Sequence, residues 1–288
     1  MEIAWIGTGI MGAPMARRLI GGRHHLRVFN RTAAKARALA SDGAFVATDI
    51  GEAANGAEII FIMVPDTPDV EAVVAALEPS LKRDQLVIDM STVSPDGERA
   101  IAQRLREKDV AYLDAPVSGG ETGAIEGTLT IMVGGPQDAF NRARPLFELM
   151  GKRITLMGPS GAGQTTKLAN QIAVALTLEA TAEALLFARE GGLDPARALE
   201  AISAGAAGSW QMSNLGPKII AKDYRPGFFI KLIRKDLRLV AGAANENNLA
   251  LPGLTLMASL FNAAAALGHD MDGTQAVAAA LDSIAKLK

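Results

Sequence analysis

A lysine and the two carboxamide residues that follow it lie at helical spacing in the segment Gly-Gln-Thr-Thr-Lys-Leu-Ala-Asn-Gln, residues 163–171. Lys167 and Asn170 are three residues apart and Gln171 is four residues beyond Lys167, so a helix would place them on one face. An ammonium group presented with an amide can protonate a carbonyl oxygen and fix the polar groups of a substrate. The alternative is a solvated lysine on a helix surface, which the spacing alone does not exclude.

A glycine-rich turn follows the first apolar run and opens an amphipathic segment. In this context the first glycine permits a tight turn, the second lets a pyrophosphate approach the main chain, and the third allows close packing of helix on strand. The N–H groups at the start of the helix then meet the phosphates. The alternative is a structural glycine turn, but the strands predicted on either side favour a dinucleotide site formed by Gly7, Thr8, Gly9, Ile10, Met11 and Gly12.

The end of the second predicted strand bears on the choice between NAD and NADP. An acidic residue there would bind the ribose 2′-hydroxyl, but this sequence has Asn30, Arg31 and Thr32, with Lys35 one turn on. Arg31 can make a charge-assisted contact with a 2′-phosphate, and Thr32 can add a hydroxyl. The pattern predicts that NADPH is preferred over NADH; the alternative is a solvated basic residue at a helix start.

The elements that must position these residues alternate between strand and helix in the first half. The run Ile-Ile-Phe-Ile-Met-Val at residues 59–64 has no polar interruption, which is typical of a parallel strand covered on both faces. Alternation of this kind indicates an α/β doubly wound sheet. Strands are predicted at 3–6, 26–30, 58–64, 85–89, 111–114, 129–133 and 153–156, and helices at 14–20, 33–40, 69–77 and 95–108, with Ser94 as N-cap and Pro95 at the first helical position.

After about residue 161 the strand signals stop. Residues 162–190 contain no proline and predict one helix of 29 residues, about 43 Å long. Further helices are predicted from Pro195 and near 209–222, 231–247, 253–267 and 273–286. We therefore expect an N-terminal Rossmann-type NADP-binding domain at 1–161 and an all-α substrate and dimerisation domain at 162–288, joined by the long interdomain helix. An Ala-rich helical domain predicts a homodimer or homotetramer.

Composition excludes several classes of protein. The chain has 288 residues, 29 Lys and Arg against 31 Asp and Glu, and no Cys. A net charge of −2 gives no basic excess for nucleic acid, and we expect no membrane-spanning run. Without cysteine there are no disulfides, and no histidine and carboxylate pair has metal-ligand spacing, so no metal site is predicted. The N-terminus shows no secretory signal, which predicts a cytoplasmic protein.

Several motifs together resemble the β-hydroxyacid dehydrogenase family over essentially the whole chain. They are residues 7–12 followed by Met15, Asp-Ala-Pro-Val-Ser-Gly-Gly at 114–120, Gly-Thr-Leu at 127–129, the 167–171 motif and Lys-Asp-Leu at 235–237. The stretch 114–135 is most similar to the tartronate semialdehyde reductase branch of that family. Some other members reduce glyoxylate and succinic semialdehyde.

The resemblance implies a role for each matching residue. It makes Lys167 the general acid in reduction and the base in oxidation. It implies that the substrate is bound by Ser118, Gly119, Gly120, Asn170, Phe228 and Asp236, and that the coenzyme is contacted by Met63, Val64, Pro65, Thr92 and Lys235. Alternatives remain: Ser118 could cap a turn, Asp236 could be an ordinary helix acid, and Phe228 and Trp210 could be packing residues.

The resemblance thus implies an NADPH-dependent reductase of a small carboxylated aldehyde, with substrate in the cleft against the helical domain. The substrate would be tartronate semialdehyde, succinic semialdehyde, glyoxylate or methylmalonate semialdehyde. A non-catalytic NADP-binding module is the main alternative, and the presence of Lys167 counts against it. A 6-phosphogluconate-type decarboxylase is a third interpretation, disfavoured by the short chain.

Overall fold

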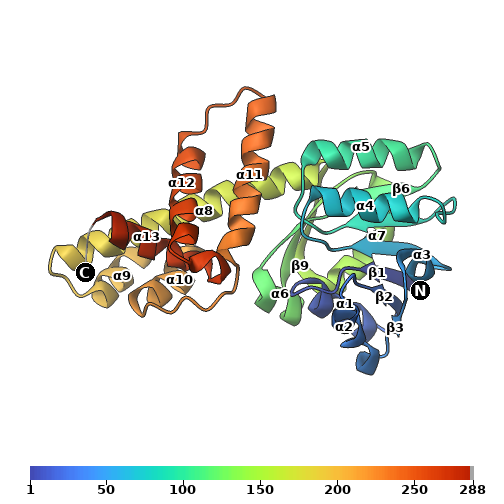
Figure 1. Cartoon of the computed structure of the whole chain (residues 1–288), viewed down its shortest axis with the longest axis horizontal. Helices are drawn as coiled ribbons and strands as arrows, with labels where there is room; N and C mark the ends of the chain where they lie inside the picture. The colour runs from blue at the N-terminus through green and yellow to red at the C-terminus, as the bar shows by residue number, and fades with distance from the viewer. Residues whose placement is uncertain (286–288) are drawn as a thin grey trace. The chain divides into compact units, whose positions relative to one another are not determined.

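The computed structural model describes residues 1–285, with alternating strands and helices followed by helices alone (Figure 1). The first part contains β1 (Glu2–Ile6), α1 (Gly12–Gly21), β2 (His25–Phe29), α2 (Ala33–Arg37), β3 (Phe45–Val46), α3 (Ile50–Ala54), β4 (Ile59–Ile62), α4 (Thr67–Leu77), β5 (Leu86–Asp89), α5 (Pro95–Arg106), β6 (Ala111–Asp114), β7 (Val117–Ser118), α6 (Gly120–Glu126), β8 (Leu129–Gly134), α7 (Gln137–Met150) and β9 (Gly151–Gly158). The rest contains α8 (Ala162–Glu190), α9 (Pro195–Ser203), α10 (Trp210–Ile220), α11 (Ile230–Glu246), α12 (Pro252–Ala266) and α13 (Val277–Ile284).

The chain forms two compact units, Met1–Lys167 and a second that begins at Leu168. The division falls within α8, so this continuous helix contributes its first residues to one unit and the remainder to the other. Lys167 is therefore the last residue of the first unit. Asn170 and Gln171 lie three and four residues further along the same helix, in the second.

The first unit is built on one sheet with strand order β3-β2-β1-β4-β5-β6-β8-β7, and β9 pairs with β8. Strand β4 is paired in parallel with β1 and β5, and all four of its residues are buried. This confirms the parallel strand predicted from the uninterrupted apolar run. The carboxyl ends of β1, β2, β4, β5 and β6 consequently lie at the same edge of the sheet.

The predicted Rossmann-type α/β sheet is confirmed, and its last strands make it a mixed sheet. Strand β8 is antiparallel to both β6 and β7, and parallel to β9. The sequence prediction also lacked β3, α3, β7, α6 and α7, and it extended α2 to residue 40, where the structure has a 3-10 turn at Ala40–Asp42. Strands of two residues such as β3 and β7 carry too few side chains to show a period.

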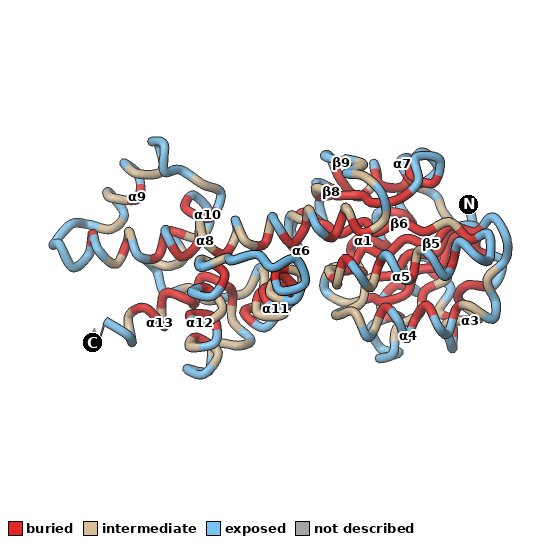
Figure 2. Tube along the Cα trace, turned by 90° about the horizontal axis from the view of Figure 1, so that it is seen from above, coloured by how far each residue is buried: buried red, intermediate tan, exposed pale blue. Residues whose placement is uncertain are grey.

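Two apolar layers cover the two faces of the sheet. Alternate residues of β1 face opposite layers, with Ile3 and Trp5 packed among residues of α1 and α7, and Ala4 and Ile6 among residues of α3, α4 and α5. Figure 1 shows α4 and α5 side by side on one face, and Figure 2 shows the central strand β5 as buried. The sheet is thus a fixed platform for the loops at its edge.

Helix α5 begins where the sequence indicated. The Ser94 hydroxyl accepts a hydrogen bond from the N–H of Gly97 at 3.4 Å, and Pro95 occupies the first helical turn. The predicted N-cap and proline are therefore confirmed.

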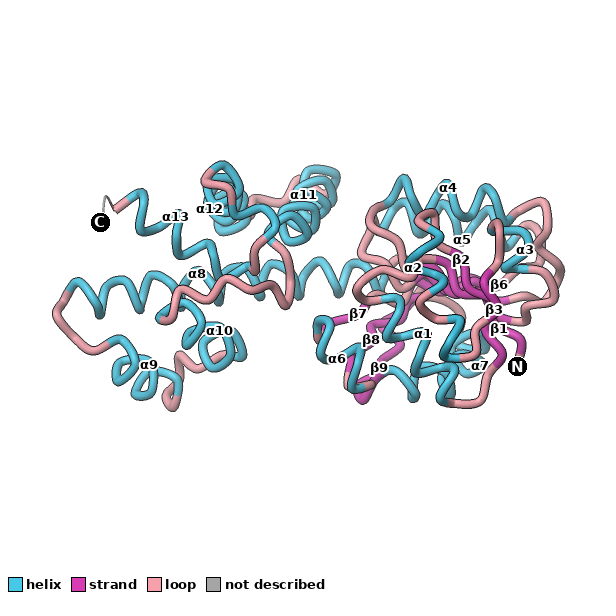
Figure 3. The backbone as a smooth tube through the Cα atoms, turned by 60° about the horizontal axis from the view of Figure 1, so that its bottom comes forward, coloured by secondary structure: helices cyan, strands magenta, loops and turns pink. Residues whose placement is uncertain are grey.

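The described part of the second unit is helical, as predicted (Figure 3). Helix α8 has the predicted bounds, and α11, α12 and α13 pack with it around an apolar core that includes Leu178, Met257 and Phe261. The last predicted helix instead starts as a 3-10 turn at Thr274–Ala276, and Lys286 lies outside the described residues.

By length and composition alone, α8 is the one described helix that could cross a membrane, which the sequence analysis did not expect. Its Ala175, Leu178 and Ala182 are buried in the core of the second unit. Packing of these residues against other helices accounts for the apolar composition of α8.

Candidate active site

The glycine-rich turn after β1 has room only for glycine at two of its three glycine positions. Gly7 has a φ of +100°, and a Cβ there would lie 2.0 Å from the main-chain oxygen of Met63. A Cβ on Gly12 would lie 2.0 Å from the oxygen of Gly7. Around Gly9, by contrast, a Cβ would meet nothing within 4 Å. The open position is the one at which a pyrophosphate approaches the main chain, so this turn fits a dinucleotide.

The carboxamide of Asn30 holds this turn to the end of β2. Its Oδ1 accepts a hydrogen bond from the N–H of Thr8 at 3.0 Å, and its Nδ2 donates to the oxygen of Thr32 at 3.0 Å. The Arg31 side chain, in contrast, is 88% exposed and lies 3.5 Å from Asp69 Oδ1. Because a pair this exposed contributes little to stability, Arg31 remains available to a ligand.

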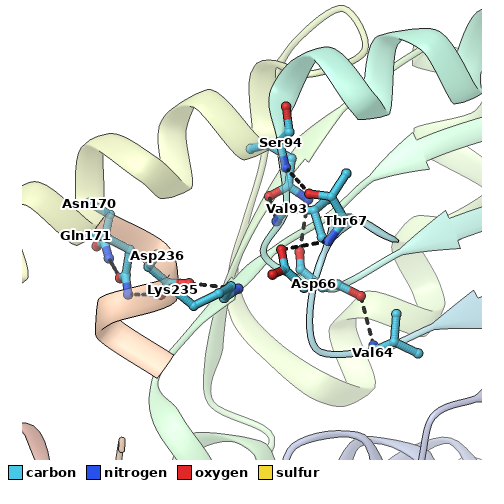
Figure 4. Close-up of polar contacts among 11 residues, drawn as sticks. Val64, Asp66, Thr67, Val93, Ser94, Asn170, Gln171, Lys235 and Asp236 are labelled. Carbon is cyan, nitrogen blue, oxygen red and sulfur yellow. Dashed lines mark hydrogen bonds and ion pairs between the residues drawn. The ribbon is translucent and has the colours of Figure 1, made fainter. Parts of the chain in front are cut away.

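The loops that follow β4 and β5 are joined through Ser91, which is fully buried. Its Oγ accepts a hydrogen bond from the N–H of Val64 at 2.9 Å and donates to Asp89 Oδ1 at 2.6 Å. A second link joins the same loops, since the N–H of Ser94 donates to Thr67 Oγ1 at 3.0 Å (Figure 4). These bonds fix the segment around Thr92 beside the segment around Val64.

The buried carboxylate of Asp114, at the end of β6, receives the first turn of α8. Its Oδ1 accepts from the N–H of Gly161 at 2.7 Å and its Oδ2 from the N–H of Gln164 at 2.9 Å. Burial raises the pKa of Asp114 above its ordinary value, while these two N–H donors act in the opposite direction. A carboxylate at this place also interacts favourably with the N-terminal end of the helix.

The predicted carboxylate-binding residues lie at the junction of β7 and α6. Ser118 is half-buried at the end of β7. Gly119 and Gly120 follow with φ values of +136° and +63°. Both values lie in the region that favours glycine, so the local main chain explains the glycine pair.

In the second unit, four polar residues of α8 and α11 form what we call the amide–carboxylate cluster: Asn170, Gln171, Lys235 and Asp236 (Figure 4). Asn170 Nδ2 donates to Gln171 Oε1 at 2.9 Å, and Gln171 Nε2 donates to Asp236 Oδ2 at 2.5 Å. Lys235 Nζ lies 2.8 Å from Asp236 Oδ1. Both oxygens of the buried Asp236 are thus engaged by protein groups, which suits it to orient its neighbours.

Lys167 and two aromatic residues complete the set of predicted site residues. The Lys167 side chain is largely buried, with the residue 7% exposed, unlike a solvated surface lysine. Phe228 is half-buried and packs against the helical core of the second unit, whereas Trp210 is 64% exposed. Sequence reasoning gave no role to Gln164 or Ser91, although Gln164 lies within the quoted lysine motif and three residues before Lys167.

The described residues contain no group of three or more His, Cys, Asp or Glu side chains that could hold a metal ion.

Comparison with known proteins assigns both parts of the chain. Residues 2–158 match the model of the NAD binding domain of 6-phosphogluconate dehydrogenase, and residues 161–281 match that of the NAD-binding region of NADP-dependent 3-hydroxyisobutyrate dehydrogenase. The chain is 44% identical over 292 residues to 2-hydroxy-3-oxopropionate reductase of Escherichia coli K12, covering 100% of this chain and 99% of that protein.

Two further dehydrogenases are similar to this chain over nearly its whole length. The NAD-dependent L-serine dehydrogenase of Pseudomonas aeruginosa is 37% identical over 90% of this chain and 91% of its own. The structure of Mycobacterium tuberculosis 3-hydroxyisobutyrate dehydrogenase with L-serine superimposes with a TM-score of 0.92 at 31% identity, covering 97% of this chain and 98% of that one.

Proposed function

The chain belongs to the β-hydroxyacid dehydrogenase family and is an NAD(P)-dependent oxidoreductase, and from this premise we propose that it reduces a small carboxylated semialdehyde to the hydroxyacid with NADPH. The candidate substrates are tartronate semialdehyde, succinic semialdehyde, glyoxylate or methylmalonate semialdehyde. The reverse oxidation uses the same groups in opposite roles.

The turn at residues 7–12 fits the nicotinamide coenzyme, because it leaves open space at Gly9 and admits no side chain at Gly7 or Gly12. When bound, the reduced nicotinamide supplies a hydride to the aldehyde carbon. We propose that Thr8, Ile10, Met11, Asn30, Thr32, Lys35, Met63, Val64, Pro65, Thr92 and Lys235 complete its binding site.

In the proposed reaction, Lys167 donates a proton to the oxygen of the aldehyde as negative charge develops there. Asn170 holds the polar end of the substrate, while Ser118, Gly119 and Gly120 bind its carboxylate. Phe228 and Asp236 act on the substrate side. Since Asp236 already bonds Gln171 and Lys235, it would act by orienting these groups.

NADPH preference is proposed from Arg31, whose exposed guanidinium stands at the end of β2 where an acidic residue would bind the ribose of NAD. The family that residues 161–281 match is that of an NADP-dependent 3-hydroxyisobutyrate dehydrogenase, although one relative is named an NAD-dependent enzyme. Both coenzymes therefore belong in the test.

We further propose that residues 1–161 form the main coenzyme-binding domain and also supply Ser118, Gly119 and Gly120 to the substrate. Residues 162–288 would form the substrate and dimerisation domain of a cytoplasmic homodimer or homotetramer, which also supplies Lys235 to the coenzyme. Apart from the coenzyme, the small-molecule partner in this proposal is the aldehyde and hydroxyacid pair.

The burial of Lys167 within a dehydrogenase lysine motif is the observation that carries the proposal. To test it, reduction of each of the four aldehyde acids would be assayed with NADPH and with NADH. Oxidation of L-serine would be assayed with NADP⁺ and with NAD⁺. Propanal is the matched control because it lacks the carboxylate. We expect at least one acid to exceed propanal by about 100-fold, since donors that a bound substrate covers without pairing them are costly.

Equal turnover of propanal and the acids would exclude a carboxylate anchor. Coenzyme binding without turnover of any substrate would favour the non-catalytic module.

A further inference from the structure

Gln164 connects the first turn of α8 to the loop after β5. The residue is fully buried, and its carboxamide bonds both sides of Thr92. Nε2 donates to the main-chain oxygen of Ser91 at 2.9 Å, and Oε1 accepts from the N–H of Val93 at 3.1 Å. One side chain therefore fixes the main chain on either side of a proposed coenzyme contact.

The main chain around Gln164 is also held close to the sheet. Its own N–H donates to Asp114, as does that of Gly161. A Cβ on Gly163 would lie 2.4 Å from the oxygen of Met132 in β8 and 2.7 Å from that of Asp114. The first turn of α8 thus has little freedom to shift along the ends of β6 and β8.

Lys167 lies three residues after Gln164, about one helical turn, so the two side chains emerge from the same face of α8. Ser91 carries the connection onward, because its Oγ also accepts the N–H of Val64. Val64, Thr92 and Lys167 are consequently linked through Ser91 and Gln164. This linkage lies wholly within the first unit.

We propose that Gln164 is a positioning residue of the reaction, whose carboxamide sets the coenzyme-contacting segment at Thr92 relative to the proton-donating lysine, Lys167. The inference rests on the proposed function for its catalytic meaning. Misplacement of reacting groups by about 1 Å can reduce a rate by about 100-fold. A residue that ties the coenzyme side to the proton donor should therefore affect turnover more than ligand affinity.

Two substitutions separate positioning from bulk packing. Gln164→Met keeps a side chain of similar length but leaves the Ser91 oxygen and the Val93 N–H without the side-chain partner. Gln164→Glu introduces a carboxyl group that, when protonated, donates through O–H and accepts through C=O in the pattern of the carboxamide. When ionised it has no donor for the Ser91 oxygen. Burial and the Asp114 carboxylate favour the protonated form, while Lys167 one turn on favours the ionised form.

The matched control is Thr165→Ala. Thr165 is the next residue of the same turn and is exposed. Its hydroxyl donates to the oxygen of Gly161, the residue that precedes the helix. All variants would be checked for thermal unfolding temperature, NADPH affinity, KM and kcat.

We expect Gln164→Met to lower kcat by about 10- to 100-fold while NADPH affinity and KM change by less than about threefold. Relative to wild type, kcat of Gln164→Glu should fall as pH rises from about 6 to about 9, as the introduced carboxyl loses its proton. The Gln164→Met ratio should stay low across that range, and Thr165→Ala should match wild type.

A kcat of Gln164→Met equal to that of wild type would overturn the proposal, as would a kcat of Gln164→Glu that rises relative to wild type as pH rises. Wild-type enzyme that turns over none of the substrates would instead count against the proposed function. Amide hydrogen exchange then decides the linkage itself. Faster exchange at Val93 in Gln164→Met than in Thr165→Ala supports the linkage, and equal exchange overturns it.

Discussion

The edge of the sheet in the first unit and the amide–carboxylate cluster in the second unit are built by different means. At the sheet edge, the main chain forms the surface, and Gly7 and Gly12 are required because neighbouring carbonyl oxygens leave no space for a Cβ. In the cluster, side chains hold one another, with Gln171 between Asn170 and Asp236. A main-chain site depends on strand register, whereas a side-chain site depends on donor and acceptor pairing.

Lys167 is the last residue of the first unit, on a helix that continues into the second unit. Its backbone is fixed by the sheet edge through the first turn of α8, and its helix continues to the cluster. The difference between the regions predicts which substitutions affect folding, coenzyme binding or chemistry alone.

The largest effect is expected at this junction. Lys167→Ala should reduce turnover by about 10² to 10⁴-fold because a positioned proton donor is lost, while NADPH binding changes little. Lys167→Arg should not restore activity, since a guanidinium hardly deprotonates. Steady-state turnover and NADPH fluorescence titration measure the two quantities. Activity within threefold of wild type would remove the lysine from the mechanism.

A pair of glycine substitutions tests the main-chain site. Gly7→Ala places a Cβ 2.0 Å from a carbonyl oxygen at a φ of +100°, so it should lower the free energy of unfolding by about 2–4 kcal/mol. Gly9→Ala meets no atom within 4 Å. It should therefore unfold like wild type but bind coenzyme weakly, because the methyl group occupies the path of the pyrophosphate. Equal unfolding temperatures for both variants would contradict this difference.

Arg31 is a side-chain contribution at the otherwise main-chain sheet edge, and its removal should be selective. Arg31→Ala should weaken NADPH binding by about 1–3 kcal/mol and leave NADH binding nearly unchanged, because a charge-assisted contact to the 2′-phosphate is lost. Arg37→Ala, an exposed arginine at the end of α2, the helix that follows Arg31, is the control. Equal weakening of both coenzymes would show that Arg31 does not select between them.

The smallest effect concerns a pH-dependent pair further along α8 in the second unit. Burial and the neighbouring Glu183 raise the pKa of Glu179 from 4.5 to about 7. Between these values the folded protein keeps a proton that the unfolded chain has lost, so stability falls as pH rises through this range.

Glu179→Gln should remove about 1–2 kcal/mol of this pH dependence, less than the full linkage value because solvent screens part of the charge. Urea unfolding at several pH values from about 5 to about 8 measures it. Glu200→Gln, an exposed glutamate on α9, should leave the slope unchanged. An unaltered slope in Glu179→Gln would mean that this pair does not control the pH response.

The predictions from sequence were most accurate where one local pattern decided the outcome. The span of α8 matches residue for residue, since no glycine or proline interrupts it after Gly163 and a glycine pair follows Glu190. Helix α7 was missed although Phe140, Leu146 and Phe147 carry an apolar face, because Pro145 lies inside it. The Asn30 carboxamide was expected at the coenzyme, whereas the structure shows it also holding the glycine turn.

The sequence by itself determined the glycine spacing, the parallel character of β4 and the length of α8, because main-chain freedom and apolar period are properties of neighbouring residues. Only the tertiary structure decided that Gln164 bonds Val93, 71 residues away, and that Asp236 bonds Gln171, 65 residues away. It also decided the antiparallel edge formed by β8. Such pairings depend on where packing places distant strands and helices, which no local pattern records.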